Sequence, residues 1–445
     1  MSRYFGTDGV RGRANADLTP ELALAVASAA ARVLASHDGS HRPMAVVGRD
    51  PRVSSEMLEA AVVAGLTSAG ADVRLVGVLP TPAVAYLTQL YGADLGVVLS
   101  ASHNPMPDNG VKLFARGGQK LPDDLEAEIE AEIDSGWTRP RPTGAAIGRV
   151  TVSTDGGAAY SDHLLKAAAA SLAGIKVIVD CAHGAASTVA GDLLRRAGAE
   201  VEVFAGEPDG ENINDGVGST HLEPLSRLVV QRGADLGIAL DGDADRCLAV
   251  DAYGAVVDGD QILAICARAL KEQSLLAEDT VVVTVMSNLG FHHAMTAAGI
   301  KVLTTSVGDR YVLEALTGRQ LSLGGEQSGH VIFTDAATTG DGLLTALRLM
   351  SCMASSGSSL DKLASIVVRL PQAMVNVQVG DRNVVAASPD VQAAVAAASV
   401  ELGDGGRILL RPSGTEQLVR VMVEAASQEH AEELAHRVAD VVRSA

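Results

Sequence analysis

Short apolar runs alternate with helix-forming segments along most of this chain, and that alternation limits the folds open to it. The runs at 44–47, 73–76 and 95–99 are rich in valine and leucine, whereas the segments between them have the spacing and end signals of helices. Strands that alternate with helices form βαβ units, in which parallel strands pack beneath the helices. The sequence therefore predicts α/β domains with largely parallel or mixed sheets.

Two local details can be predicted within this pattern. Ser54 or Ser55 can cap the helix that follows the first central strand and ends near residue 70, because serine side chains accept hydrogen bonds from the free N–H groups of a helix start. Further along the chain, an apolar and alanine-rich segment predicts one helix over 185–197.

The length of the chain predicts several domains. A chain of 445 residues is long enough for three or four domains of ordinary size. A segment with several prolines and glycines at 138–148 is typical of a linker. We place domains at 1–148, 149–253 and 254–368, followed by a smaller unit at 369–445.

The charge balance and the cysteines exclude some classes of protein. Lysine and arginine number 35 against 54 aspartates and glutamates, giving a net charge of −19, which disfavours nucleic acid or an anionic membrane as the main partner. The four cysteines are scattered without a Cys-x-x-Cys pair, so we expect reduced thiols in a cytoplasmic protein rather than zinc or disulfides. We also expect no signal peptide and no transmembrane span.

A small polar loop, 100–105 (Ser-Ala-Ser-His-Asn-Pro), follows the strand predicted at 95–99. Its proline prevents the strand from continuing, and open α/β sheets bind their ligands at the carboxyl ends of their strands. Ser102 could therefore be a nucleophile or a phosphate carrier, with His103 beside it and Lys112 on the next short strand. The same residues could also form an ordinary turn, since short motifs occur by chance.

Three aspartates follow the strand predicted at 236–240. Asp241, Asp243 and Asp245 alternate around a glycine and an alanine, and carboxylate oxygens are the ligands that Mg²⁺ prefers. Three acids this close would repel one another without a cation, so the motif predicts a metal site rather than a solvated turn. Arg246 is placed to hold an anionic ligand of the same ion.

Two further loops carry groups suited to a sugar phosphate. Residues 325–330 (Gly-Glu-Gln-Ser-Gly-His) offer a carboxylate, a hydroxyl and an imidazole between glycines, a set that can bind several sugar hydroxyls. Residues 411–416 (Arg-Pro-Ser-Gly-Thr-Glu) combine a guanidinium, two hydroxyls and free N–H groups, which suits a phosphate. Near the start, Arg11 lies among glycines that allow a close approach to an anion.

Taken in order, these loops make the whole chain similar to the α-D-phosphohexomutase superfamily. The start at 6–12 (Gly-Thr-Asp-Gly-Val-Arg-Gly) and the glutamine at 327 are most similar to the branch that acts on glucosamine phosphates. The resemblance implies three similar α/β domains with mixed sheets and a smaller C-terminal α+β domain, arranged around a central cleft. The chain departs from the family at Gln417, where proline is usual.

The resemblance also implies an activity. It implies an isomerase, an intramolecular phosphotransferase that interconverts glucosamine 6-phosphate and glucosamine 1-phosphate for UDP-N-acetylglucosamine biosynthesis. The implied route uses phosphoserine at Ser102, one Mg²⁺ per chain and a hexosamine 1,6-bisphosphate as intermediate and activator. A sugar phosphate is then the partner, and a homodimer is possible.

Individual residues receive roles from the same resemblance. Ser102, Asp241, Asp243 and Asp245 would hold the metal. Arg11, Lys112 and Arg246 would surround the transferring group, and Lys112 or His330 would move the hydroxyl proton. Glu326 and Ser328 would bind the sugar, while the substrate's other phosphate would meet a set of residues near the C-terminus: Arg411, Ser413, Gly414, Thr415 and Arg420.

Three alternatives stay open at this point. The same mechanism could act on glucose or mannose phosphates. A metal-dependent sugar phosphatase could use the same aspartates with water as the acceptor. A sugar-phosphate sensor could keep the pocket without the phosphate carrier.

Overall fold

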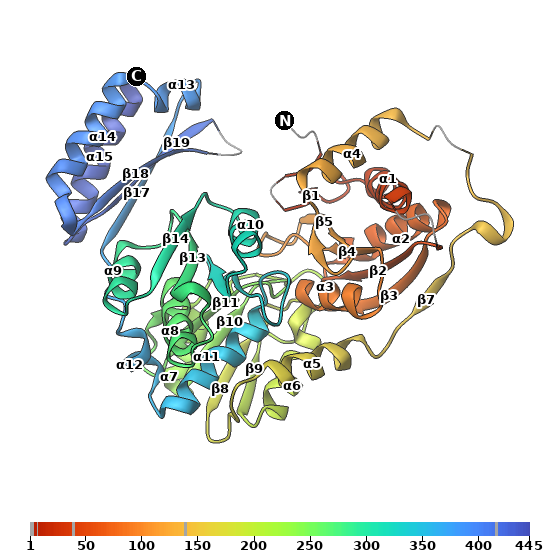
Figure 1. The fold of residues 1–445 in the computed structure, drawn as a ribbon, viewed down its shortest axis with the longest axis horizontal. Coiled ribbons are helices and arrows are strands. Elements are labelled where there is room, and N and C mark those ends of the chain that lie inside the picture. The colour runs from red at the N-terminus through yellow and green to blue at the C-terminus, as the bar shows by residue number, and fades with distance from the viewer. Residues whose placement is uncertain (1–3, 7, 38–40, 138–139, 414–416) are drawn as a thin grey trace. The chain divides into compact units, whose positions relative to one another are not determined.

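The chain folds into two compact units (Figure 1), and the computed structural model describes residues 4–6, 8–37, 41–137, 140–413 and 417–445. The first unit comprises Met1–Met286 and Ile300–Ile366, and the second comprises Ser287–Gly299 and Val367–Ala445. Each unit has its own sheets and its own hydrophobic core.

The first sheet of the first unit has the strand order β1-β5-β4-β2-β3-β7, and β6 pairs with β5. Neighbours among β2, β3, β4 and β7 are parallel, whereas β5 is antiparallel to both β4 and β1. The strands are β1 (Val10–Arg13), β2 (Met44–Arg49), β3 (Asp72–Val78), β4 (Leu95–Leu99), β5 (Asp108–Ala115), β6 (Gln119–Lys120) and β7 (Val150–Val152). The helices of this region are α1 (Pro20–His37), α2 (Val53–Ser68), α3 (Thr81–Leu90) and α4 (Asp123–Ser135).

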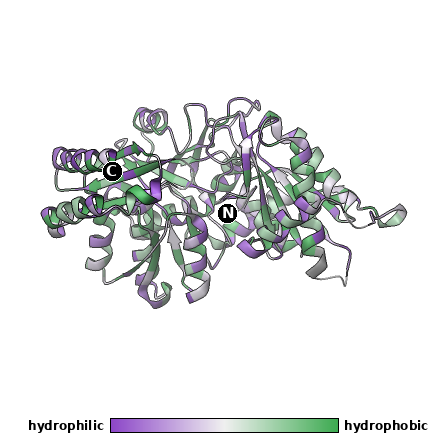
Figure 2. Ribbon diagram, turned by 90° about the horizontal axis from the view of Figure 1, so that it is seen from above, coloured by the Kyte–Doolittle hydropathy of each residue, from purple (hydrophilic) through white to green (hydrophobic). Residues whose placement is uncertain are grey.

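The core of this region lies between the sheet and helices α1 and α2. Val47, Val97 and Leu99 from the strands share one fully buried cluster with Ala27 and Leu58 from the helices. Figure 2 shows the strands mainly in hydrophobic colours, while many helices carry hydrophilic residues as well. The apolar runs in the sequence therefore mark the central strands of the sheet.

The predicted serine cap of α2 is wrong. The helix begins at Val53, and the cap position is Arg52, whose side chain makes no capping hydrogen bond. The hydroxyl of Ser55 instead donates to Oδ1 of Asp50 at 2.8 Å. The Ser55 hydroxyl therefore binds the buried carboxylate of Asp50 and does not cap the helix.

β7 adds a strand to the first sheet beyond residue 148. It pairs in parallel with β3, with Val73 opposite Val150 and Leu75 opposite Val152. The chain therefore passes the proline-rich linker and returns to the first sheet before it enters the second one.

The second sheet has the order β12-β11-β10-β8-β9, in which β8, β9 and β10 are parallel and β11 is antiparallel to β10. The strands are β8 (Lys176–Asp180), β9 (Glu200–Phe204), β10 (Leu236–Leu240), β11 (Cys247–Asp251) and β12 (Val256–Val257). The helices are α5 (Gly156–Ala167), α6 (Ala190–Arg196) and α7 (Glu223–Arg232).

The single helix predicted over 185–197 is wrong. A 3-10 turn at Ala185–Thr188 precedes α6, and Val189 separates the two with a φ of −131°. The hydroxyl of Thr188 donates to the carbonyl of Ala185, a local bond that competes with helix continuation.

The third sheet has the order β14-β13-β15-β16. Its strands are β13 (Thr280–Thr284), β14 (Lys301–Thr305), β15 (Leu323–Gly325) and β16 (Val331–Phe333), and its helices are α8 (Gly259–Glu272), α10 (Asp309–Arg319), α11 (Gly342–Ser356) and α12 (Leu360–Ala364). β13 is parallel to β14 and β15, whereas β16 is antiparallel to β15. The short β15–β16 hairpin presents the 325–330 loop.

The second unit is a smaller α+β domain. Its antiparallel sheet has the order β17 (Gln372–Gln378), β19 (Leu418–Glu424) and β18 (Arg407–Pro412). Figure 1 shows α14 (Pro389–Leu402) and α15 (Gln428–Ser444) side by side against this sheet, and α13 (Arg382–Ala386) and α9 (Leu289–Ala297) complete the unit. The predicted combination of α/β domains with mixed sheets and a smaller α+β domain is confirmed.

Among the described residues, every helix is too short or too polar to cross a bilayer.

Candidate active site

Ser102 lies in the loop after β4 with a left-handed backbone conformation. Its φ is +53°, a region that costs a residue with a side chain about 1–2 kcal/mol. Its N–H donates to Oγ of Ser100 at 3.0 Å, and its carbonyl accepts from Nδ2 of Asn214 at 2.9 Å. The conformation therefore depends on bonds that the rest of the fold supplies.

A fully buried ion pair supplies most of that support. Arg52 donates through Nε to Oδ2 of Asp50 at 2.8 Å, and both side chains have no exposed surface. The two terminal nitrogens of Arg52 donate to three carbonyl oxygens in the 100–105 loop: Ser102 (3.2 Å), Asn104 (2.8 Å) and Pro105 (2.6 Å). Arg52 thus fixes the backbone at Ser102 and at the residues that follow it.

The aspartate cluster (Asp241, Asp243 and Asp245) lies directly after β10. One carboxylate oxygen from each residue falls within 4.8 Å of the others, and all three residues are buried. The hydroxyl of Ser102 donates to Oδ2 of Asp241. The structure therefore brings the predicted phosphate carrier and the predicted metal ligands together, although they are 139 residues apart in the sequence.

The donor set of the cluster fits a divalent cation. Among the described residues, Oδ1 of Asp243 and Oδ1 of Asp245 are buried without a hydrogen-bond partner. Burial, followed by repulsion from Asp245 and Asp243, raises the pKa of Asp241 well above its usual value. Buried oxygens without partners are costly, and a hard cation is the group that would satisfy them. The three aspartates could hold a metal.

Lys112 on β5 neutralises part of this charge. Its Nζ lies 2.8 Å from Oδ2 of Asp243, 3.2 Å from Oδ2 of Asp245 and 3.0 Å from Oδ2 of Asp8. Burial alone would lower the pKa of Lys112, but these three carboxylates outweigh it and hold the pKa well above its usual value. Lys112 is therefore a fixed cation at the edge of the cluster.

Asp8 is a site residue that the sequence analysis missed. Burial raises the pKa of this carboxyl, yet Lys112 and Arg11 more than reverse the shift and hold it well below its usual value. The hydroxyl of Thr81, also missed, donates to Oδ2 of Asp243 at 2.6 Å. Asp8 belongs to the same glycine-rich segment as Arg11, and that segment could have indicated it as a site residue. Thr81 follows a proline at a helix start, a sequence that does not indicate a functional role.

Two arginines with partly exposed side chains lie close enough to His103, the residue after Ser102, to act on its charge. Arg11 pairs with Asp8, Arg246 lies 3.8 Å from Asp245, and both arginine side chains are 24% exposed. His103 responds to both: its burial, then Arg246 and Arg11, lower its pKa to about 4. The imidazole of His103 is thus neutral at pH 7, and its Nδ1 lies 3.4 Å from Oγ of Ser102.

The 325–330 loop is anchored by backbone bonds and keeps polar side chains without partners. The N–H of Glu326 donates to the carbonyl of His330 at 2.9 Å, and the N–H of Gly308 donates to Oε1 of Glu326 at 3.2 Å. In the described part of the chain, Oγ of Ser328 and both ring nitrogens of His330 are buried without hydrogen bonds. Such groups are suited to bind the hydroxyls of a ligand.

This loop lies within electrostatic reach of the aspartate cluster. His330 helps to hold the pKa of Asp245 down, against the effect of burial and together with Lys112. Glu326 is among the carboxylates that raise the pKa of Arg246, again against the effect of burial. Loops from three sheets therefore converge within the first unit.

The remaining predicted residues belong to the second unit. Arg411 and Arg420 face each other across β18 and β19, so both guanidiniums start from one position of the antiparallel sheet. The N–H of Ser413 donates to the carbonyl of Leu418 at 2.9 Å, and Ser413 is buried. Gly414 and Thr415 lie outside the described residues.

Comparison with family descriptions and solved structures defines the class of protein. Four phosphoglucomutase/phosphomannomutase descriptions match in order: alpha/beta/alpha domain I at 2–139, domain II at 158–254, domain III at 258–370 and the C-terminal domain at 374–441. A phosphoglucomutase/phosphomannomutase family protein from Burkholderia thailandensis has the same fold, with a TM-score of 0.83 and 24% identity over 98% of this chain and 97% of its own. The chain belongs to the phosphoglucomutase/phosphomannomutase family, as its loops predicted.

More similar relatives narrow the class. A protein from Saccharopolyspora erythraea is 64% identical over 99% of both chains, and one from Salinispora arenicola is 62% identical over 100% of this chain and 99% of its own. Both bear the name phosphoglucosamine mutase. N-acetylphosphoglucosamine mutase from Aspergillus fumigatus, solved with GlcNAc-6P and magnesium, shares the fold with a TM-score of 0.71 and 20% identity over 100% of this chain and 96% of its own. The present chain is an isomerase of the intramolecular phosphotransferase class.

Proposed function

We propose that this chain interconverts glucosamine 6-phosphate and glucosamine 1-phosphate. The observation that carries the proposal is the hydrogen bond from Ser102 to Asp241 inside a buried aspartate cluster. Support for the amino sugar comes from the relatives at 64% and 62% identity, which are named for that activity. The product would serve UDP-N-acetylglucosamine biosynthesis.

Ser102 carries the phosphoryl group in this proposal. A hydroxyl of the bound sugar monophosphate attacks phosphorus, the bond from phosphorus to Oγ of Ser102 breaks, and a hexosamine 1,6-bisphosphate forms. The bisphosphate then returns its other phosphoryl group to Ser102, which leaves the isomer. When bound by Ser102, Asp241, Asp243 and Asp245, one Mg²⁺ per chain would offset the charge of the phosphoryl group.

The surrounding cations stabilise the charge on the transferring group. Arg11 and Arg246 each keep about a quarter of their side-chain surface exposed, so their guanidiniums can donate to phosphate oxygens. Lys112 is already bound to Asp8 and the cluster and needs no movement to add its charge. Stabilisation by fixed charges of this kind is usually the largest contribution to phosphoryl transfer.

The proton of the attacking hydroxyl needs an acceptor, and Lys112 and His330 are the two candidates. The three carboxylates around Lys112 keep it protonated. His330 has ring nitrogens without partners among the described residues, so its contacts favour it as the acceptor. Kinetics of a variant test this choice: His330→Asn should lower kcat by about a hundredfold or more if the imidazole accepts the proton, and an unchanged kcat would assign the proton to Lys112.

Substrate orientation is assigned to two further groups of residues. Glu326 and Ser328 bind the sugar hydroxyls in either orientation of the bisphosphate. The phosphate that is not being transferred binds residues of the second unit, namely Arg411, Ser413, Gly414, Thr415 and Arg420.

Phosphorus NMR with Mg²⁺ and a trace of hexose bisphosphate tests the proposal. Glucosamine 6-phosphate, glucose 6-phosphate and mannose 6-phosphate are supplied in separate samples. We expect a rapid 1-phosphate signal from the glucosamine sample and slow conversion of the others. Rapid conversion of glucose or mannose phosphate alone would overturn the assigned substrate, and release of inorganic phosphate alone would identify a phosphatase.

A further inference from the structure

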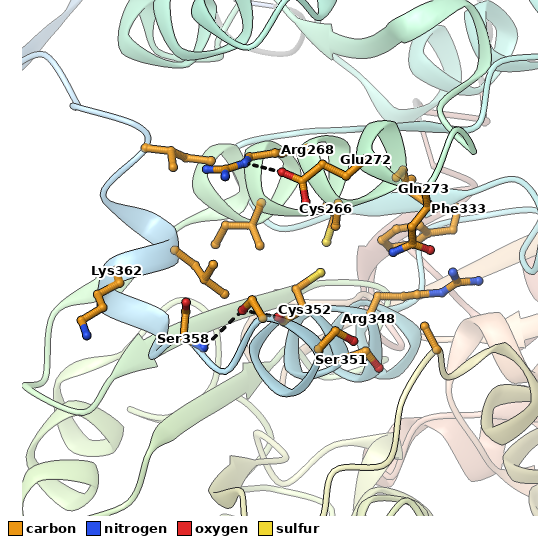
Figure 3. A pocket seen from close by; sticks show the side chains of 18 residues that line it. Cys266, Arg268, Glu272, Gln273, Phe333, Arg348, Ser351, Cys352, Ser358 and Lys362 are labelled. Carbon is orange, nitrogen blue, oxygen red and sulfur yellow. Dashed lines mark hydrogen bonds and ion pairs between the residues drawn. The ribbon is translucent and has the colours of Figure 1, made fainter.

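A cavity of about 370 Å³ lies in the first unit between α8, α11 and α12 (Figure 3). Its lining includes none of the residues assigned above to metal, phosphate or sugar. The volume lies within the usual range for small-molecule sites. Apolar side chains line part of the cavity. The charged and thiol side chains in its lining are Cys266, Arg268, Glu272, Arg348, Cys352 and Lys362.

The polar lining of this cavity favours an anionic ligand. Arg268 donates to Glu272 at 2.9 Å and Arg348 donates to Asp335 at 2.7 Å, so Lys362 is the cation that exceeds these two pairs. Nε of Arg348 and Oγ of Ser351 are buried without a partner among the described residues, and Ser351 is only 2% exposed. These two buried donors line the cavity and have no hydrogen-bond acceptor, so they could donate to an acceptor group of a bound ligand.

Two thiols also line the cavity. Figure 3 shows the side chains of Cys266 on α8 and Cys352 on α11 pointing toward one another. Cys266 is buried, whereas Cys352 is partly exposed. Cys352 is thus the thiol that a ligand in the cavity can reach.

The surroundings of Cys352 favour its thiolate. Its interaction with the Cys266 thiol, assisted by Arg348 one turn earlier on α11, outweighs burial and lowers the pKa of Cys352. Burial instead raises the pKa of Cys181 and of Cys247 well above the usual value. Because the thiolate is the nucleophile in disulfide exchange, and because Cys181, Cys247 and Cys266 are buried while Cys352 is partly exposed, Cys352 should react before the other cysteines.

We propose that this cavity is a thiol-modification site in which Cys352 forms a mixed disulfide with a small disulfide that carries a carboxylate. The sulfur of Cys352 attacks one sulfur of the incoming disulfide, a new S–S bond forms and the original S–S bond breaks. The released half leaves as a thiolate and takes up the proton that Cys352 lost. Cys352 is oxidised while the leaving half is reduced, so the incoming disulfide is the only co-reactant.

Labelling of the full chain with two disulfide reagents tests the proposal. A bis-nitrobenzoate disulfide carries carboxylates, whereas a dipyridyl disulfide is neutral. We expect each folded chain to release a single equivalent of nitrothiobenzoate, and peptide mass spectrometry should place the adduct on Cys352. Cys352→Ser should remove the fast reaction, whereas Cys266→Ser, whose hydroxyl can still donate a hydrogen bond to Cys352, should keep it. An adduct on Cys266, an unchanged rate in Cys352→Ser, or labelling that appears only in denaturant would overturn the proposal.

The charge requirement has a separate test. Lys362 is exposed, so Lys362→Gln should fold normally. Loss of one nearby cation should slow the anionic reagent by about threefold while the neutral reagent keeps its rate. Lys301→Gln, an exposed lysine on β14 outside the cavity lining, is the matched control and should leave the ratio of the two rates unchanged. If Lys362→Gln also leaves that ratio unchanged, an anion-selective site is excluded.

Discussion

Ser102 combines a nucleophilic hydroxyl with a backbone conformation that serine seldom adopts. Ser102 follows the carboxyl end of β4, where it has a φ of +53° and its hydroxyl donates to Asp241. Strain of this kind persists only where the surrounding structure holds it, and it is concentrated at functional sites. The conformation thus links one residue's geometry to the phosphate-carrier role proposed for it.

Ser102→Ala should lower turnover by about a thousandfold or more, because loss of a covalent carrier removes the reaction route itself. The measurement is the initial rate of glucosamine 6-phosphate conversion with bisphosphate present. Ser100→Ala is the matched control, because Ser100 lies in the same loop as Ser102. The substitution removes a hydroxyl that donates to Asp50 and should cost only a part of the activity. Substantial turnover in Ser102→Ala would contradict the carrier role.

His103 should make stability depend on pH in the acidic range. Its pKa in the folded chain is about 4, against an ordinary value of 6.5. Between these values the unfolded chain binds a proton that the folded chain does not, so stability rises with pH across this window and is lost as pH falls toward 4. His103→Asn should flatten this part of the curve in urea unfolding measured from pH 4 to pH 7.

NMR of the imidazole supplies an independent check. The ring signals of His103 should stay those of the neutral form down to about pH 4. A His103 signal that titrates near the ordinary histidine value of 6.5 would show that burial and the two arginines do not act on it.

At the scale of elements, the 100–105 loop keeps its shape because the segment between β2 and α2 holds it. Arg52 is fully buried and donates to three carbonyls of that loop, while Asp50 accepts from the hydroxyls of Ser55 and Ser100. The planar guanidinium of Arg52 has enough donors in fixed directions to bind Asp50 and the three carbonyls together, whereas the ammonium of a lysine does not. One helix start therefore sets the position of a loop that follows a different strand.

Arg52→Met should destabilise the chain by about 3–5 kcal/mol, because it leaves Asp50 buried without its partner. Arg52→Lys keeps the charge but loses the fork, so we expect a smaller loss of stability and about a hundredfold lower kcat from a displaced Ser102. Unfolding in urea and steady-state kinetics measure the two effects separately.

Arg49→Lys is the control for Arg52. Arg49 pairs with Glu56, whose side chain is largely exposed, and with Glu59, and an exposed pair such as the first contributes about 0–1 kcal/mol. Equal effects of the Arg49 and Arg52 substitutions on kcat would mean that Arg52 has no special part in positioning Ser102.

Much of this element-level structure could be predicted from the sequence, and the omissions share one cause. The runs at 95–99 and 236–240 are strands with the predicted bounds, because each is a continuous segment of apolar residues and glycine that ends at a polar loop. Asp50, Arg52 and Thr81 escaped notice because their partners are remote. Thr81 meets Asp243 across 162 positions, and Arg52 meets Ser102 across 50. A local sequence pattern cannot predict contacts between residues that only the folded topology brings together.

The whole molecule has a net charge of −19, and its buried aspartate cluster concentrates part of that charge in the first unit. The second unit has its own hydrophobic cluster, which includes Val421, Leu434 and Val438. Separate cores predict that the two units unfold in separable steps. A ligand of one unit should then stabilise that unit alone.

Mg²⁺ should raise only the unfolding transition of the first unit in scanning calorimetry. A ligand that binds only the folded state stabilises it by about 2.7 kcal/mol at a concentration of 100 Kd, and chelation should reverse the shift. Leu434→Ala removes a fully buried side chain from the second unit and should lower that unit's transition, which identifies it in the trace. Asp243→Asn should remove the Mg²⁺ shift while the second transition stays in place. A Mg²⁺ shift that persists in Asp243→Asn, or that falls on the transition lowered by Leu434→Ala, would place the metal outside the aspartate cluster.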